Sequence, residues 1–219
     1  MNFDLMARSF PLLLAGAGIT VEITAMSVTF GLLIGCMVGI ARLCSVKPLR
    51  YFANVYVDFI RGTPLLVQIF LVYFALPNLT GSRVDPYFAA ISACSINSGA
   101  YVAEIFRAGI QSIDKGQMEA GRSLGMGYVP VMRHIIIPQA IKNILPALGN
   151  ELITLFKDTS LVTVIGLADL TKVAIQVQAK TYQAFMPFIG IAVVYLTIVL
   201  ILTWLLGILE RRLRQSDRH

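Results

Sequence analysis

Apolar runs dominate the chain and determine its predicted architecture. A helix needs about 20 mostly apolar residues to cross roughly 30 Å of hydrocarbon, and several stretches of the sequence reach that length. Windows of apolar length predict five spans, at residues 11–41, 51–76, 86–110, 139–156 and 188–209. We therefore expect an all-α membrane protein with about five transmembrane helices, folded as a single domain over residues 1–219.

Composition supports lipid as the surroundings of most of the chain. Of the 219 residues, 57% are hydrophobic and only 14% are charged, whereas soluble domains carry about 25% charged residues. The segment 188–209 contains no charge, and Glu210 and Arg211 end it abruptly. The first apolar run lacks a preceding basic region and is too long for a cleaved signal, so we expect it to be retained as a span.

Basic residues collect at one side of the predicted spans. Because cytoplasmic loops and span ends retain Lys and Arg, the bias predicts an outer N-terminus and a cytoplasmic C-terminus. The cytoplasmic side then receives Arg42, Lys47, Arg50, Arg107, Lys115, Arg122, Arg133, Lys142, Arg211, Arg212, Arg214 and Arg218. The outer side receives only Arg8, Arg83, Lys157, Lys172 and Lys180. This placement accounts for the net charge of +6 through membrane topology, and we expect no nucleic-acid partner.

Three glycines in the first predicted span share one helical face. Gly31, Gly35 and Gly39 recur at four-residue intervals, which lets another helix approach the backbone closely. We interpret this face as a packing seam.

Two connections between spans are too long to be simple turns. In residues 111–138, a helical pattern over 116–123 is broken by glycines at 125–127 and resumes at 128–137. This predicts a cytoplasmic helix-turn-helix that forms a compact docking knob. In residues 157–187, Asp169, Lys172 and Lys180 interrupt an apolar pattern, so we expect a short re-entrant or surface helix there.

The knob carries a motif with fixed spacing. In order, its residues are Glu119, Ala120, Gly121, Gly125, Ile135, Ile137 and Pro138. The pattern closely resembles the EAA loop of ABC-importer permeases: EAA, three residues, G, nine residues, I, one residue, LP. Gly121 stands where the motif has a second alanine, and Ile137 stands where it has leucine.

The resemblance implies a mechanism and partners. The loop at 111–138 would be the coupling helix that sits in a groove on a cytoplasmic ATP-binding subunit, which works as a dimer and holds ATP and magnesium. Glu119 would offer that subunit a charge-assisted contact, and Ala120 and Gly121 would permit close approach. The permease would pair with itself or with a similar chain, and an extracytoplasmic amino acid-binding protein would deliver cargo.

Other segments resemble the permeases of polar amino acid importers, including those for glutamine, histidine and arginine. They are residues 61–64, 96–101, 149–150 and 157–161. This resemblance covers nearly the whole chain. It implies a type I ABC importer permease with five spans in the bacterial inner membrane.

Several residues within the spans are candidates for binding cargo. Pro64 removes a backbone donor, and freed carbonyls at membrane depth need protein or a water-filled cavity beside them, which indicates either a pathway wall or a packing kink. Glu151 and Asp158 are seven residues apart and share a helix face, which would favour a cationic passenger. In the alternative interpretation, Asp158 pairs with Lys157 or Lys172, and Glu151 is neutral or bonded to Lys142 or Arg61. The candidate substrate-binding residues are Asn97, Glu151, Asp158, Thr63 and Pro64, and the predicted cargo is arginine, lysine or histidine, with glutamine or cystine as the alternative.

Two other classes of protein are less consistent with the sequence. A gradient-driven secondary transporter would be expected to show inverted repeats and carboxylates in both halves, and the acidic pair occurs once. An enzyme would need catalytic or metal-binding motifs, and the sequence has no Ser-His pair, no HExxH and no CxxC. Because it also lacks a GxxxxGK[ST] loop, we expect ATP hydrolysis to belong to a separate subunit and no cofactor to bind this chain.

Overall fold

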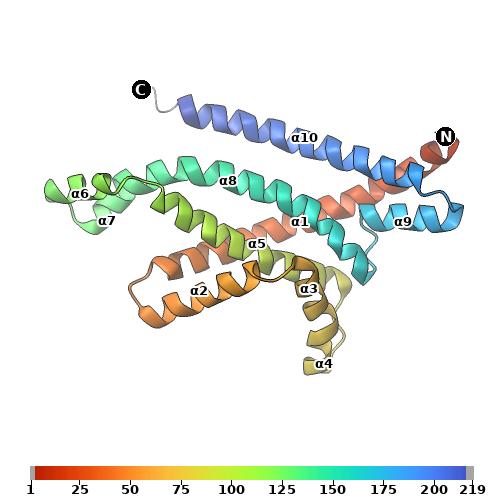
Figure 1. Cartoon of the computed structure of the whole chain (residues 1–219), viewed down its shortest axis with the longest axis horizontal. Coiled ribbons are helices and arrows are strands. Elements are labelled where there is room, and N and C mark those ends of the chain that lie inside the picture. The colour runs from red at the N-terminus through yellow and green to blue at the C-terminus, as the bar shows by residue number, and fades with distance from the viewer. Residues whose placement is uncertain (1–2, 216–219) are drawn as a thin grey trace.

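The structure is a computed structural model that describes residues 3–215, and over that range it is helical, without strands (Figure 1). Arg218 and His219 lie outside the described residues. In chain order the helices are α1 (Phe3–Leu43), α2 (Lys47–Arg61), α3 (Leu65–Phe70), the π-helical η1 (Leu71–Ala75), α4 (Leu76–Thr80), α5 (Pro86–Gln111), α6 (Lys115–Ser123), α7 (Tyr128–Val131), the π-helical η2 (Met132–Ile136), α8 (Ile137–Asp158), the 3-10 helix η3 (Thr159–Ile165), α9 (Leu170–Thr181) and α10 (Phe185–Gln215). The all-α prediction is confirmed.

Helices α1 and α5 pack together along the centre of the molecule. A Cβ atom added to Gly35 would lie 2.3 Å from Cγ1 of Val102, and one added to Gly31 would lie 2.8 Å from Cβ of Ser98. Real Cβ atoms do not come this close to other heavy atoms, so these positions need glycine. The predicted packing seam is confirmed, and its partner is α5.

The described residues contain two to four candidate spans by length and composition. Two single helices qualify, and two further pairs qualify if each bent pair counts as one span. The single helices are Ser9–Leu43 and Phe185–Leu213, and the bent pairs are Lys47–Arg61 with Leu65–Thr80 and Tyr128–Ile165 with Leu170–Thr181. Helix α5 is not among them, and polar and ionisable residues such as Asn97, Glu104 and Arg107 lower its mean hydropathy. The count of five spans remains a prediction.

The second predicted span, 51–76, is not one continuous helix. Helix α2 ends at Arg61 and α3 begins at Leu65, at an angle of 104° between the two halves. Pro64 is the cause, since it has no N–H to continue the helical ladder and its ψ of 140° is extended. The expected kink is therefore a sharp corner.

The connection 157–187 contains the short helix that the sequence predicts. After α8, the chain passes through η3 and turns at Gly166, whose φ is +90°. Asp169 then caps α9, because its carboxylate accepts hydrogen bonds from the backbone N–H groups of Thr171 and Lys172 at 3.0 and 3.1 Å. Asp169 is thus a helix start signal rather than an interruption.

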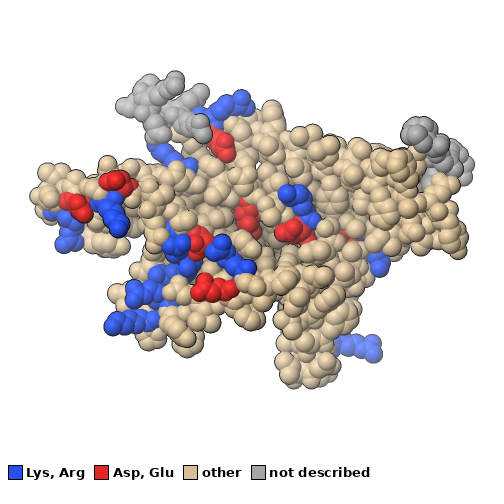
Figure 2. Space-filling view, in the orientation of Figure 1, with Lys and Arg blue, Asp and Glu red and all other residues tan. Residues whose placement is uncertain are grey.

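Charged residues gather toward one end of the molecule. Figure 2 shows most of the visible Lys and Arg over the end that carries α6, α7 and the start of α2, while the opposite end is largely uncharged on this face. Such segregation is what the predicted topology requires. The outer N-terminus and cytoplasmic C-terminus stay predictions, because the structure contains no membrane.

Candidate functional site

A cavity of about 420 Å³ lies where the corner between α2 and α3 meets α5 and α8. Its walls contain all five residues that the sequence analysis selected as candidates for substrate binding. The lining residues are Arg61, Gly62, Thr63, Pro64, Leu65, Asn97, Tyr101, Glu151, Thr154 and Asp158. Residues from three distant parts of the chain therefore converge on one polar space.

Gln68, which the sequence analysis missed, secures the corner. Its side-chain nitrogen donates to the carbonyl oxygen of Ile60 at 2.8 Å and to the carbonyl and hydroxyl oxygens of Thr63, both at 3.1 Å. Its side-chain oxygen accepts a hydrogen bond from Asn97 Nδ2 at 3.0 Å. Carbonyls that the break leaves without a helical partner thus gain one inside the protein, as buried polar groups require. A lone glutamine in the apolar run after Pro64 was the available signal.

Asn97 and Thr63 belong to this same arrangement. Asn97 is buried, with 7% of its surface exposed, and its amide links α5 to α3 through Gln68. The Thr63 hydroxyl donates to the carbonyl oxygen of Phe59 at 3.0 Å. Both residues line the cavity and shape its wall.

Two carboxylates line the α8 side of the cavity. Glu151 and Asp158 are both half-buried and lie two turns apart on α8. Within the described part of the chain, Glu151 has no ion pair with Arg61, and Asp158 has none with Lys157 or Lys172, at a limit of 4.0 Å. These suggested pairings are therefore not what the structure shows.

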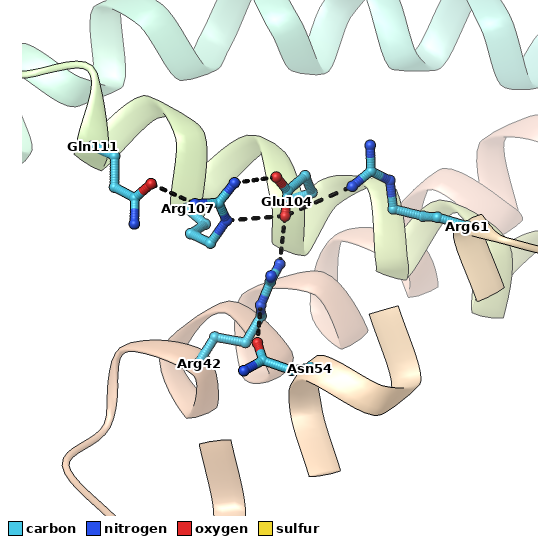
Figure 3. A network of polar contacts seen from close by, with 6 residues as sticks. All are labelled: Arg42, Asn54, Arg61, Glu104, Arg107 and Gln111. Carbon is cyan, nitrogen blue, oxygen red and sulfur yellow. Dashed lines mark hydrogen bonds and ion pairs between the residues drawn. The ribbon is translucent and has the colours of Figure 1, made fainter. Parts of the chain in front are cut away.

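Arg61 instead belongs to a cluster around Glu104 that the sequence analysis did not identify (Figure 3). One guanidinium nitrogen of Arg42, from α1, lies 2.6 Å from the Glu104 carboxylate, and Arg107 contacts both carboxylate oxygens from one turn further along α5. Arg61, at the end of α2, lies 3.7 Å away. Arg42 also donates to Asn54 on α2 at 2.8 Å, so the cluster joins α1, α2 and α5.

A separate site is the knob formed by α6, α7 and η2, which matches the helix-turn-helix predicted within residues 111–138. The turn after α6 is a Schellman motif: Met126 N–H bonds to the carbonyl of Gly121 at 3.1 Å, and Gly125 N–H bonds to that of Arg122 at 3.0 Å. Gly125 has a φ of +82°, a region that favours glycine. The glycine of the motif therefore has a backbone reason for its identity.

The motif residues divide between the knob's interior and its surface. Gly121 is buried, and a Cβ there would lie 2.7 Å from Cγ2 of Val131, so its close contact is within the knob rather than with a partner. Glu119, Ala120 and Pro138 are exposed, and Ile135 is half-buried. The knob's surface also carries apolar side chains, with Leu124 at 83% and Val129 at 69% exposure.

The arrangement defines a class: a helical membrane protein with a polar cavity between its helices and a helix-turn-helix knob at its basic end. Comparison with known proteins makes the assignment specific. The chain belongs to the family described as the binding-protein-dependent transport system inner membrane component, whose model matches residues 31–215.

Individual relatives are similar over almost their whole length. The chain is 44% identical to the arginine transport system permease protein ArtQ of Bacillus subtilis, covering 99% of this chain and 100% of the relative. It is 42% identical to the glutamine transport system permease protein GlnP of Escherichia coli K12, covering 98% and 99%.

Solved structures agree with the fold. A crystal structure of an amino acid ABC transporter with histidines superimposes with a TM-score of 0.93 at 48% identity, covering 97% of this chain and 99% of that one. The MetNI methionine ABC transporter, in an inward-facing conformation, has a TM-score of 0.76 at 21% identity, which supports the fold alone.

Proposed function

We propose that this chain is the permease subunit of an ATP-driven importer of polar L-amino acids and that it prefers cationic ones. The observation that carries the proposal is the cavity into which α8 brings both Glu151 and Asp158, with Thr63, Pro64 and Asn97 on the facing walls. Two carboxylates in a partly dehydrated space attract a cation more strongly than they would in water. The relatives named for arginine and glutamine support the class of cargo.

The importer would work by alternating access with partner subunits. ATP and magnesium bind a separate ATPase dimer, which docks on the knob, and an extracytoplasmic binding protein delivers the amino acid. The permease itself forms a dimer, either with a second copy or with a similar chain, and lies in the bacterial inner membrane. Residues 1–219 form one transmembrane domain, with the coupling loop at 111–138. Glu119, Ala120, Gly125, Ile135 and Pro138 either form the docking surface or hold its shape, and Gly121 packs inside it.

Glutamine is the second candidate cargo, because the GlnP relative is nearly as similar as ArtQ. A glutamine side chain is neutral and would not need both carboxylates. Cystine remains an alternative on the sequence alone. A gradient-driven transporter is not supported, since the chain belongs to a family of binding-protein-dependent systems.

Replacement of Glu151 by Gln tests the cargo preference. Loss of one charge-assisted contact costs about 1.5–3 kcal/mol, so the ratio of arginine to glutamine uptake should fall by roughly 10- to 100-fold in the assembled importer. Asp58→Asn, an exposed carboxylate on α2, is the matched control and should leave the ratio unchanged. An unaltered ratio in Glu151→Gln would sink the proposed preference for cations.

A further inference from the structure

Arg61 lies between the Glu104 cluster and the cavity. Its guanidinium carbon lies 5.2 Å from the centroid of the Tyr101 ring, and both residues line the cavity wall. The nearest Glu104 oxygen is 3.7 Å from Arg61 Nη1, a distance that allows attraction but no hydrogen bond. These two contacts hold the guanidinium at the cavity without using its donors.

Glu104 does not need Arg61 for its own neutralisation. Arg42 and Arg107 already donate hydrogen bonds to both of its oxygens. The Arg42 side chain is 9% exposed, whereas that of Arg61 is 39% exposed. Arg61 is therefore the surplus cation of the cluster and the one most open to another ligand.

The donors of Arg61 are available. A guanidinium has five N–H donors arranged as a planar fork, which matches the geometry of a carboxylate. Among the described residues, none of these donors forms a hydrogen bond with a side chain or carbonyl. A polar cavity whose wall contains a positioned, unused fork has the chemistry to bind a carboxylate.

The charges around the cavity mirror those of one class of passenger. The cavity has two anions, Glu151 and Asp158, and one cation, Arg61. A cationic L-amino acid has two cationic groups, the α-ammonium and the side chain, and one anion, the α-carboxylate. We infer that Arg61 binds the α-carboxylate of the passenger and that Glu104, with Arg42 and Arg107, positions Arg61 to do so. This inference rests on the proposed function and deepens it.

The test compares arginine with arginine amide, which keeps both cationic groups but has no carboxylate. Binding is measured calorimetrically on the purified permease–ATPase complex. The binding protein is left out, because it would itself bind the carboxylate of arginine. The wild-type complex should bind arginine at least about 10-fold more tightly than the amide. In Arg61→Gln the arginine affinity should fall to that of the amide, while the affinity for the amide does not fall.

Controls separate this role from general damage. Arg50→Gln removes an exposed arginine from the same helix and should keep the wild-type ratio of arginine affinity to arginine amide affinity. Glu104→Gln should lower the arginine affinity several-fold and leave the amide unchanged, as expected of a positioning residue. If Arg61→Gln does not assemble, Arg61→Lys, which retains the charge but loses the fork, should reduce the ratio several-fold.

Failure of the inference differs from failure of the proposed function. If an Arg61 variant still binds arginine and keeps the wild-type ratio of arginine affinity to arginine amide affinity, the inference alone is wrong. If the wild-type complex binds glutamine but not arginine, the cationic preference is wrong, and glutamine with its α-amide then tests Arg61 in the same way. Binding of no amino acid at all would overturn both.

Discussion

Gln68 shows how one side chain makes a break in a membrane helix tolerable. The corner at Pro64 frees carbonyls that have no helical partner, and an unsatisfied polar group is costly when water is absent. Gln68 is only 5% exposed and covers two of these carbonyls while holding Asn97 at the cavity wall. The shape of the cavity therefore depends on a residue that is not among its lining residues.

Replacement of Gln68 by Leu should destabilise the corner. The buried amide of Asn97 would lose its acceptor, and the carbonyl of Ile60 would keep only its longer 3.4 Å hydrogen bonds from the N–H and hydroxyl of Thr63, at a cost of about 1–3 kcal/mol. The thermal unfolding midpoint of the purified complex should fall by several degrees, and the affinity for cargo should fall with it. Gln176→Leu, at an exposed position on α9, is the control. An unfolding midpoint equal to that of wild type would show that water replaces the amide at no cost.

At this scale the sequence predicted the cavity residues but not their neighbours. Asn97, Glu151 and Asp158 could be selected because polar groups within apolar spans need an explanation. Glu104 could not be assigned a role, because Arg42 and Arg61 reach it from helices that are distant in sequence. The placement of partners across helices is a property of the packing, which no periodicity encodes.

Among the elements, the knob has the most specific local design. The Schellman turn between α6 and α7 fixes the angle at which the second segment leaves, and this angle depends on the left-handed backbone of Gly125. A β-branched residue there would be strained whatever the free space around it.

Gly125→Val should uncouple ATP hydrolysis from transport. The strain, about 1–2 kcal/mol or more, would distort the turn, so stimulation of ATPase activity by the loaded binding protein in liposomes should be lost. Gly127→Ala is the matched control, because its φ of −70° suits any residue and its added Cβ would lie an ordinary 3.6 Å from Pro130. Retained stimulation in Gly125→Val would argue that the knob does not transmit force.

The seam between α1 and α5 makes a second prediction for an element. Gly35→Ala would place a methyl group 2.3 Å from Val102, so the two helices would have to separate, at a cost of about 1–3 kcal/mol. A lower unfolding midpoint is expected. Gly18→Ala is the control on the same helix, since no heavy atom lies within 4 Å of its added Cβ. Equal unfolding midpoints for the two variants would show that α1 and α5 accommodate the added methyl group without loss of stability.

Sequence periodicity predicted most helices but not their breaks. The knob and the short helix after α8 were expected from turn residues and charges. The right-angled corner at residues 62–64 was expected only as a kink, because proline predicts a lost hydrogen bond but not the direction of the chain that follows. That direction depends on Gln68 and on packing against α5.

At the scale of the whole molecule, the basic end and the cavity lie in different places along the helices. Basic residues lie toward the end that carries the knob, which agrees with the predicted cytoplasmic position of the knob (Figure 2). The cavity lies away from the knob, at the corner between α2 and α3, and the helices α5 and α8 run between them (Figure 1). The long α5 and α8 thus connect the knob with the walls of the cavity.

The most direct test of this account is ATP-driven uptake by proteoliposomes that contain the permease, its ATPase and its binding protein. Labelled arginine should accumulate only with ATP, and unlabelled lysine or histidine should compete more strongly than glutamine or cystine. Accumulation driven by an ion gradient without ATP would contradict the assigned mechanism. Stronger competition by glutamine or cystine than by the cationic amino acids would contradict the proposed preference for cationic cargo.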